Sequence, residues 1–202
     1  MFSGAQISLY PMTDDFVRVI LDAIGALEPY RPAFRIETDD ISTLLVGPPD
    51  QLFPAMRDLF VAAAGSGTHC VLAATVSRGC PGEPDDPICT PIGRSEHDLP
   101  LEDRIASAIA HAAAAPMTGQ IVAAQFSLYP LGSGHHMDEI YGCIDFLKQS
   151  GVFDRSKNFC TKLRGDAGQV FATLSEAFLR FGAPEGHVAL DIKVSANSPT
   201  AA

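Results

Sequence analysis

Two short stretches of the chain repeat the same polar and aromatic side chains in the same order. They are Gln6, Ser8 and Tyr10 in AQISLYPM, and Gln125, Ser127 and Tyr129 in AQFSLYPL. A tyrosine ring offers a stacking surface, while serine and glutamine offer both donors and acceptors to ring nitrogens and an exocyclic amine. The set is therefore suited to binding a small flat heterocycle.

Motifs for catalysis, by contrast, are missing from the sequence. GxGxxG, GxxxxGK[ST], GxSxG and HExxH do not occur, and each would have indicated a mechanism with a known geometry. His135 and His136 are adjacent on a predicted helix, where neighbouring side chains point about 100° apart and chelate poorly. Cys80 could be a reactive thiol, but the sequence places no oriented base beside it. We expect no catalytic residue, no metal and no cofactor apart from a bound ligand.

The repeated stretches belong to a duplication that spans most of the chain. The first stretch recurs 119 positions later with six of eight residues identical. Near the end of each half, THCVLAATVS aligns with GHVALDIKVS, and the two histidines, His69 and His187, are 118 positions apart. Matches that keep both order and spacing indicate two copies of one unit.

Each half predicts the order strand, helix, two strands, helix, strand. In the first half the expected elements are residues 5–11, 14–27, 35–38, 41–46, 50–64 and 68–77, from their alternating or helical apolar spacing. This is the ferredoxin-like βαββαβ plan, so the fold class is α+β, a tandem duplication with antiparallel sheets covered by helices on one face. We expect a first repeat over 1–98 with its Pro/Gly-rich loop, a linker helix over 99–116 and a second repeat over 117–202.

Alternation along the strands divides each sheet into an apolar face toward the helices and a polar face away from them. Asp191 and Ser195 join the polar face of the second repeat, while His69 and His187 are interpreted as structural. The repeated polar face predicts either a ligand platform or sheet-on-sheet packing, within a dimer or between the halves. The residues alone leave both alternatives open.

Bulk properties narrow the partners. The formal charge of -10, from 14 Lys and Arg against 24 Asp and Glu, argues against nucleic acid and weakly favours a cationic ligand. No apolar run reaches the roughly 20 residues needed to span a bilayer, which predicts a cytoplasmic protein. The five cysteines are odd in number and fit neither a zinc knuckle nor a CxxC site, so reduced thiols are expected.

Four segments together resemble the YkoF family. They are SLYPMTDDF (8–16), DDISTLL (39–45), GCPG (79–82) and SANSP (195–199). The resemblance covers both repeats and implies a homodimer in which each repeat binds thiamine through its hydroxymethylpyrimidine part. It also implies a role in uptake or salvage of the thiamine precursor alongside a membrane transporter, without a catalytic step.

Site residues follow from the same resemblance. The ligand-binding candidates are Gln6, Ser8, Tyr10, Asp39, Ser42, Thr43 and Ser77 in the first repeat, and Gln125, Ser127, Tyr129, Thr161, Asp191 and Ser195 in the second. The second hairpin, KNFCTKLRG, lacks the acidic turn of the first. Lys162 and Arg164 would bring positive charge to that site, which suggests the hypothesis that the two sites differ in affinity or ligand form.

Two other functions compete with binding of thiamine or its pyrimidine. The first is a regulatory or interaction protein whose ferredoxin-like units dimerise through their sheet faces. The second is an enzyme of thiamine metabolism that uses Cys80 or His135.

Overall fold

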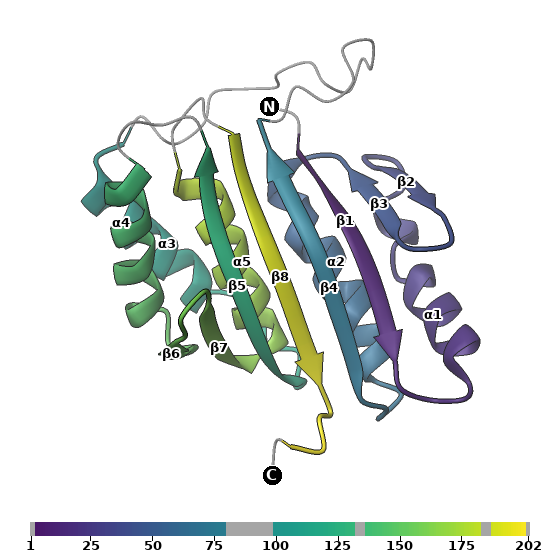
Figure 1. Cartoon of the computed structure of the whole chain (residues 1–202). Coiled ribbons are helices and arrows are strands. Elements are labelled where there is room, and N and C mark those ends of the chain that lie inside the picture. Colours follow the sequence, from purple (N-terminus) through teal and green to yellow (C-terminus); the bar gives the residue numbers. More distant parts are fainter. Residues whose placement is uncertain (1–2, 80–98, 132–135, 183–186, 201–202) are drawn as a thin grey trace.

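The computed structural model describes residues 3–79, 99–131, 136–182 and 187–200, and in it both halves of the chain form the βαββαβ order (Figure 1). The first repeat consists of β1 (Ser3–Pro11), α1 (Phe16–Gly25), a short 3-10 helix (Glu28–Tyr30), β2 (Arg35–Thr38), β3 (Thr43–Val46), α2 (Pro49–Ala64) and β4 (Cys70–Arg78). The linker helix is α3 (Leu101–Ala113). The second repeat consists of β5 (Ile121–Leu131), α4 (His136–Gln149), β6 (Phe153–Ser156), β7 (Thr161–Asp166), α5 (Ala167–Arg180) and β8 (His187–Ala196). The predicted fold class is confirmed.

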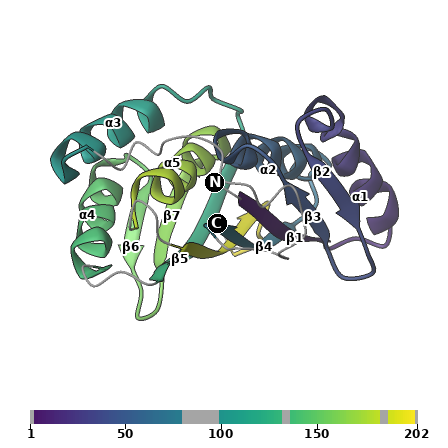
Figure 2. The ribbon, with the colours of Figure 1, turned by 90° about the horizontal axis from the view of Figure 1, so that it is seen from above.

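The two repeats share one sheet. Its eight strands run β2-β3-β1-β4-β8-β5-β7-β6, and every neighbouring pair is antiparallel. The helices form a layer on one face of this curved sheet, and the other face is left open (Figures 1 and 2). The separate sheets that the sequence suggested are therefore joined edge to edge, because β4 of one repeat pairs with β8 of the other.

An approximate twofold axis passes through this central pair of strands. Ala74 pairs with Ile192, its own equivalent at the offset of 118. His69 bonds Ser195 (3.1 Å) and His187 bonds Ser77 (2.8 Å), so the two contacts are symmetric images across the junction. The histidines thus link the repeats, which agrees with a structural role.

The same symmetry governs the helix layer, where α2 packs on α5. Phe53 lies 5.5 Å from Phe178 and Phe60 lies 6.1 Å from Phe171, measured between ring centroids. All four rings are 0–2% exposed. Phe53 is equivalent to Phe171 and Phe60 to Phe178, so the two contacts are related by the same symmetry. Both contacts join the two repeats, and one hydrophobic core therefore continues across them.

Linker helix α3 packs on the helix layer of the second repeat, against α4 and α5. Its buried Arg104 makes two 2.8 Å hydrogen bonds to the Glu139 carboxylate and one to the Arg180 carbonyl oxygen (2.6 Å). Arg78, at the end of β4, donates to the carbonyl oxygens of Phe178 and Phe181 (both 2.7 Å). Two arginines therefore satisfy carbonyls at the C-terminal end of α5, where the helix dipole favours a cation.

Helix α5 also has a side-chain cap at its N-terminus. The Asp166 carboxylate accepts hydrogen bonds from the backbone N–H groups of Gly168 (2.7 Å), Thr118 (2.9 Å) and Gly119 (2.7 Å). Burial alone would raise the pKa of this carboxyl, but these hydrogen bonds hold it below its ordinary value. Its counterpart in the first repeat, Pro48, has no side chain that could cap α2.

This cap predicts pH-dependent stability. Above the ordinary carboxyl pKa of about 3.9 the ionised Asp166 stabilises the fold, and its contribution is lost as the pH falls through the lower folded-state pKa. We expect Asp166→Asn to reduce the free energy of unfolding by roughly 1–2 kcal/mol at pH 7, with the difference shrinking below pH 4. Urea titrations between pH 3 and pH 7 measure it. Exposed Asp50, in the first turn of α2, is the matched control, and an equal effect of Asp50→Asn would contradict the assignment.

Candidate functional site

Each repeat contains a cavity of similar size at the same place in the fold. The first is about 270 Å³ and the second about 310 Å³. The first is lined by Ile7–Tyr10 of β1, Ile20 and Ile24 of α1, Leu59 of α2, and residues 38–43. The second is lined by Phe126–Tyr129 of β5, Ile140, Cys143, Ile144 and Leu147 of α4, and residues 156–161. These volumes are at the small end for ligand pockets and suit a single heterocyclic ring with its substituents.

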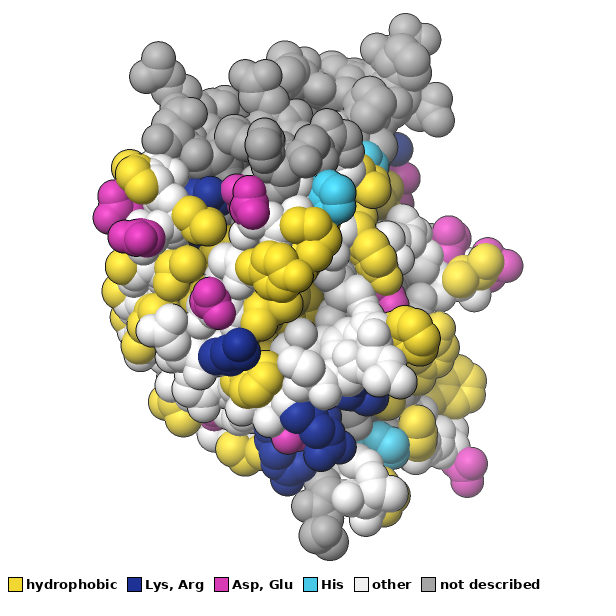
Figure 3. Space-filling model, turned by 60° about the vertical axis from the view of Figure 1, so that its left-hand side comes forward, with side chains coloured by type: hydrophobic (Ala, Val, Ile, Leu, Met, Phe, Trp, Pro, Cys, Tyr) yellow, Lys and Arg dark blue, Asp and Glu magenta, His cyan; other side chains and the backbone are white. Residues whose placement is uncertain are grey.

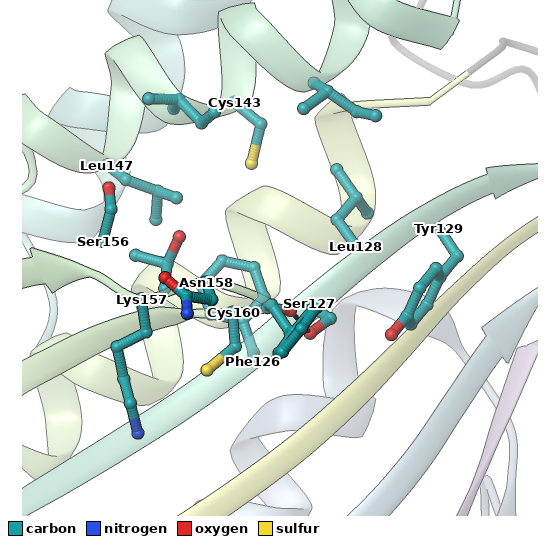
Figure 4. Close-up of a pocket in the computed structure, with 14 residues that line it drawn as sticks. Phe126, Ser127, Leu128, Tyr129, Cys143, Leu147, Ser156, Lys157, Asn158 and Cys160 are labelled. Atoms are coloured by element: carbon teal, nitrogen blue, oxygen red, sulfur yellow. Dashed lines mark hydrogen bonds between the residues drawn. The ribbon is translucent and has the colours of Figure 1, made fainter.

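The cavities lie on the helix side of the sheet, between the first strand of the repeat, its first helix and the tip of its hairpin. In Figure 4, Cys143 and Leu147 point from α4 toward β5, and Leu128 points from β5 toward α4. Tyr129 and Lys157 point away from α4. The open sheet face expected as the platform thus contributes only the edge of each cavity, and apolar helix-side residues form its walls.

The repeated serines hold the hairpin tips. Ser8 donates its hydroxyl hydrogen to the carbonyl oxygen of Ile41 (3.0 Å), and Ser127 donates to that of Phe159 (2.7 Å). These acceptors are equivalent positions of the two turns at 39–42 and 157–160. The serines therefore fix the lip of each cavity, while their oxygens keep lone pairs that can accept from a ligand amine.

Around the first cavity the glutamine and the acidic turn complete the lip. Gln6 donates to the Ser42 hydroxyl (2.5 Å). Asp39 accepts from the backbone N–H groups of Ile41 and Ser42 (both 2.8 Å), an Asx turn that closes the hairpin. These backbone hydrogen bonds lower the pKa of the Asp39 carboxyl, so it is ionised at neutral pH. Ser42 lies in this turn, since β3 begins at Thr43 and not at residue 41.

The second lip has the same turn built from different residues. The Lys157 backbone N–H donates to the Cys160 carbonyl oxygen (2.8 Å), as that of Asp39 does to Ser42 (3.0 Å). The Lys157 ammonium donates to Gln125 Oε1 (2.9 Å). Cys160 replaces Ser42, and Cys143 on α4 adds a second thiol, whose pKa is raised by burial.

Most of the candidate residues lie together, and three lie elsewhere. Ser8, Tyr10, Asp39, Ser42 and Thr43 line the first cavity, Ser127, Tyr129 and Thr161 line the second, and Gln6 and Gln125 contact the lips. Ser77 and Ser195 instead bond the histidines at the central strand junction. Asp191 pairs with Lys193 (2.7 Å) on the open face. Strand alternation placed these three on the correct face but could not give their distance from a cavity.

Exposed apolar side chains recur on or beside the elements that form the cavities, and four of them, Tyr10, Ile41, Tyr129 and Phe159, line the cavities themselves. They occupy equivalent positions: Tyr10, Met12, Val17, Leu21 and Ile41 in the first repeat, and Tyr129, Leu131, Met137, Tyr141 and Phe159 in the second. Figure 3 brings the α4 side forward and shows hydrophobic side chains gathered across the middle of that face, above a group of Lys and Arg. The sequence analysis did not assign these exposed apolar residues, or the isoleucines of α1 and α4, to the site. Their recurrence at equivalent positions of both copies could have identified them.

The part of the chain that the structure describes offers neither a metal site nor a membrane-spanning helix. It contains no group of three or more His, Cys, Asp and Glu side chains placed to hold a metal ion. None of its helices is long and apolar enough to cross a bilayer. The enzyme candidates Cys80 and His135 lie outside the described residues.

The fold and the two cavities define a tandem ferredoxin-like protein with an equivalent cavity in each repeat. The family model described as "YKOF-related Family" matches residues 2–83 and 121–201. The chain is also 33% identical over 198 residues, 98% of this chain and 92% of the relative, to the Bacillus subtilis (strain 168) protein named "Putative HMP/thiamine-binding protein YkoF". The chain therefore belongs to the YkoF-related family, as its sequence motifs indicated.

The serine contacts predict a local change in dynamics. Ser127→Ala removes the hydrogen bond to Phe159, worth about 1 kcal/mol net, so amide hydrogen exchange over residues 157–161 should accelerate roughly fivefold. Ser8→Ala should do the same over residues 39–43. Ser66→Ala, which removes another serine-to-carbonyl hydrogen bond (2.7 Å, to Ala63) just after α2, is the matched control and should leave exchange in both turns unchanged. Unchanged exchange in both the Ser127→Ala and Ser8→Ala variants would show that the hairpin tips do not depend on these contacts.

Proposed function

We propose that the chain binds thiamine through its hydroxymethylpyrimidine part, with one molecule in the cavity of each repeat, and that it does so without catalysis. The observation that carries this proposal is the duplicated cavity, with Ser8 and Tyr10 of one repeat matched by Ser127 and Tyr129 of the other. The name of the Bacillus subtilis relative supports the choice of ligand.

The lining chemistry fits an aminopyrimidine. Isoleucine and leucine side chains supply apolar walls, and the serine oxygens and hairpin backbone supply a few polar anchors, which is the composition of most small-molecule pockets. Each tyrosine lies at the mouth, about half exposed (Tyr10 52%, Tyr129 49%), where its ring is available for stacking. The proposed role is that of a cytoplasmic carrier or sensor in thiamine-precursor uptake or salvage, serving a membrane transporter.

Titration with one cavity filled tests the assignment. Ile24→Trp should fill the first cavity and Ile144→Trp the second, since both residues line the walls at equivalent positions. We expect isothermal titration with thiamine, and separately with hydroxymethylpyrimidine, to give two molecules per chain for the unaltered protein and one for each variant. Circular dichroism verifies folding of the variants.

The stoichiometry separates the outcomes of this titration. No binding of either compound to the unaltered protein would refute the proposal. If both variants still bind two molecules, the binding sites lie outside the cavities. The open sheet face would then be the candidate location.

We further propose that two chains associate through the open sheet face. At its centre, β4 and β8 present small uncharged side chains, among them Val71, Ala73 and Ala189, and the charged pair Asp191 and Lys193 is internally neutralised. An antiparallel sheet exposed on one face is stabilised by packing on a second sheet. The approximate twofold symmetry of the chain lets a second copy meet the same surface.

A charge placed in this face should separate the chains. We expect Ala73→Arg to convert a two-chain species into single chains by light scattering, because an arginine would be buried without a partner in the interface. Ala62→Arg, on the exposed side of α2, is the control and should leave the mass unchanged. A single-chain mass for the unaltered protein at micromolar concentration would contradict the association.

A further inference from the structure

The two cavities differ in the sign of the charge at their lips. Among the described residues that line the first cavity, Asp39 and Asp40 are charged and no lysine or arginine is present. Among the described residues that line the second, Lys157 is charged and no carboxylate is present. Lys157 and Asn158 are the equivalents of Asp39 and Asp40, so duplication has replaced two negative charges by one positive charge at the same turn.

Neither lip is neutralised by a neighbouring ion. The Asp39 carboxylate accepts only backbone and hydroxyl hydrogens, within the part of the chain that the structure describes. The Lys157 ammonium is held by Gln125, a neutral partner, and that hydrogen bond leaves two of its three N–H donors for a ligand. The carboxylates thus keep their negative charge at the first hairpin tip. The Lys157 ammonium keeps its positive charge at the second tip, on the side that faces away from α4.

Lys162 and Arg164, which the sequence analysis expected to charge the second site, do not account for the difference in charge between the two lips. Lys162 is paired with Asp154 (2.8 Å) and is not among the described residues that line the second cavity. Arg164, opposite Ala123, lies three positions beyond Thr161, the lining residue of β7. Lys157 at the lip is therefore the residue that brings positive charge to the second cavity.

We infer that the two cavities select opposite charge forms of one ligand: the first the cationic, unphosphorylated compound and the second its phosphate monoester. This inference rests on the proposed function, because it assigns a ligand form to each proposed site. A phosphate monoester carries close to two negative charges above pH 7 and accepts strong hydrogen bonds from ammonium groups. The same phosphate would be repelled by Asp39 and Asp40. The approximately equal apolar walls can hold the shared heterocycle in either repeat.

Single-cavity proteins test the inference directly. Ile24→Trp leaves the second cavity and Ile144→Trp the first, and each is titrated at pH 8 with thiamine and with thiamine monophosphate. We expect the second cavity to prefer the monophosphate and the first to prefer thiamine, each by roughly tenfold, the size of one charge-assisted hydrogen bond or its repulsive counterpart.

Neutralising each lip should remove its preference. In the second cavity, Lys157→Gln should lower the ratio of monophosphate affinity to thiamine affinity about tenfold, because it removes attraction for the phosphate and repulsion of the thiazolium cation. In the first, Asp39→Asn with Asp40→Asn keeps an oxygen that can close the Asx turn and should bring monophosphate binding close to that of thiamine. Lys148→Gln, on exposed α4, controls for a general loss of positive charge.

The outcomes distinguish this inference from the proposed function. If both single-cavity proteins bind thiamine and its monophosphate in the same ratio, the charge selection is overturned while the two binding sites stand. If the unaltered protein binds none of thiamine, its pyrimidine and the monophosphate, the proposed function is refuted. The charge selection is then refuted as well. A preference that survives Lys157→Gln would also overturn the assignment to this lysine.

Discussion

The antiparallel pairing of β4 with β8 is the contact on which the rest of the molecule depends. A ferredoxin-like unit ends in an edge strand, and an exposed edge presents unpaired N–H and C=O groups that invite aggregation. Here the two edges satisfy each other, and the ring pairs Phe53 with Phe178 and Phe60 with Phe171 close the core above them. Neither repeat presents that edge to solvent, so both repeats are held in one rigid frame.

The hairpin tips at the two cavities take no part in this strand junction and are therefore free to diverge. The junction residues are constrained, since each must match both its own symmetry partner and its neighbours in a continuous core. The hairpin tips are held to the first strand of their own repeat, through Ser8 and Gln6 in one copy and Ser127 and Gln125 in the other. Replacing DDIS by KNFC there preserved the turn and changed the charge at the lip. The most variable chemistry thus lies where packing constrains it least.

Asymmetry in the helix layer comes from α3, which packs against α4 and α5 of the second repeat. It covers α5, and Asp166, Arg78 and Arg104 satisfy both ends of that helix. Helix α5 is consequently buried along most of its length, whereas α2 keeps an exposed side. Duplication alone would have given two equal halves; the linker made the second half the more enclosed one.

The sequence by itself determined the duplication, the order of the elements, the fold class and the family. These are properties of local pattern and repetition, which can be read along the chain without knowing what any side chain touches. It also selected Ser8 and Ser127, although for a role on an open face. Only the tertiary structure decided that the cavities lie under the first helices and that the serines bond the hairpin tips. It likewise decided that Lys157, and not Lys162, charges the second lip. Alternation states which side chains share a face of a strand, but the partners of those side chains are some 30 residues or more away along the chain, and folding alone brings them together.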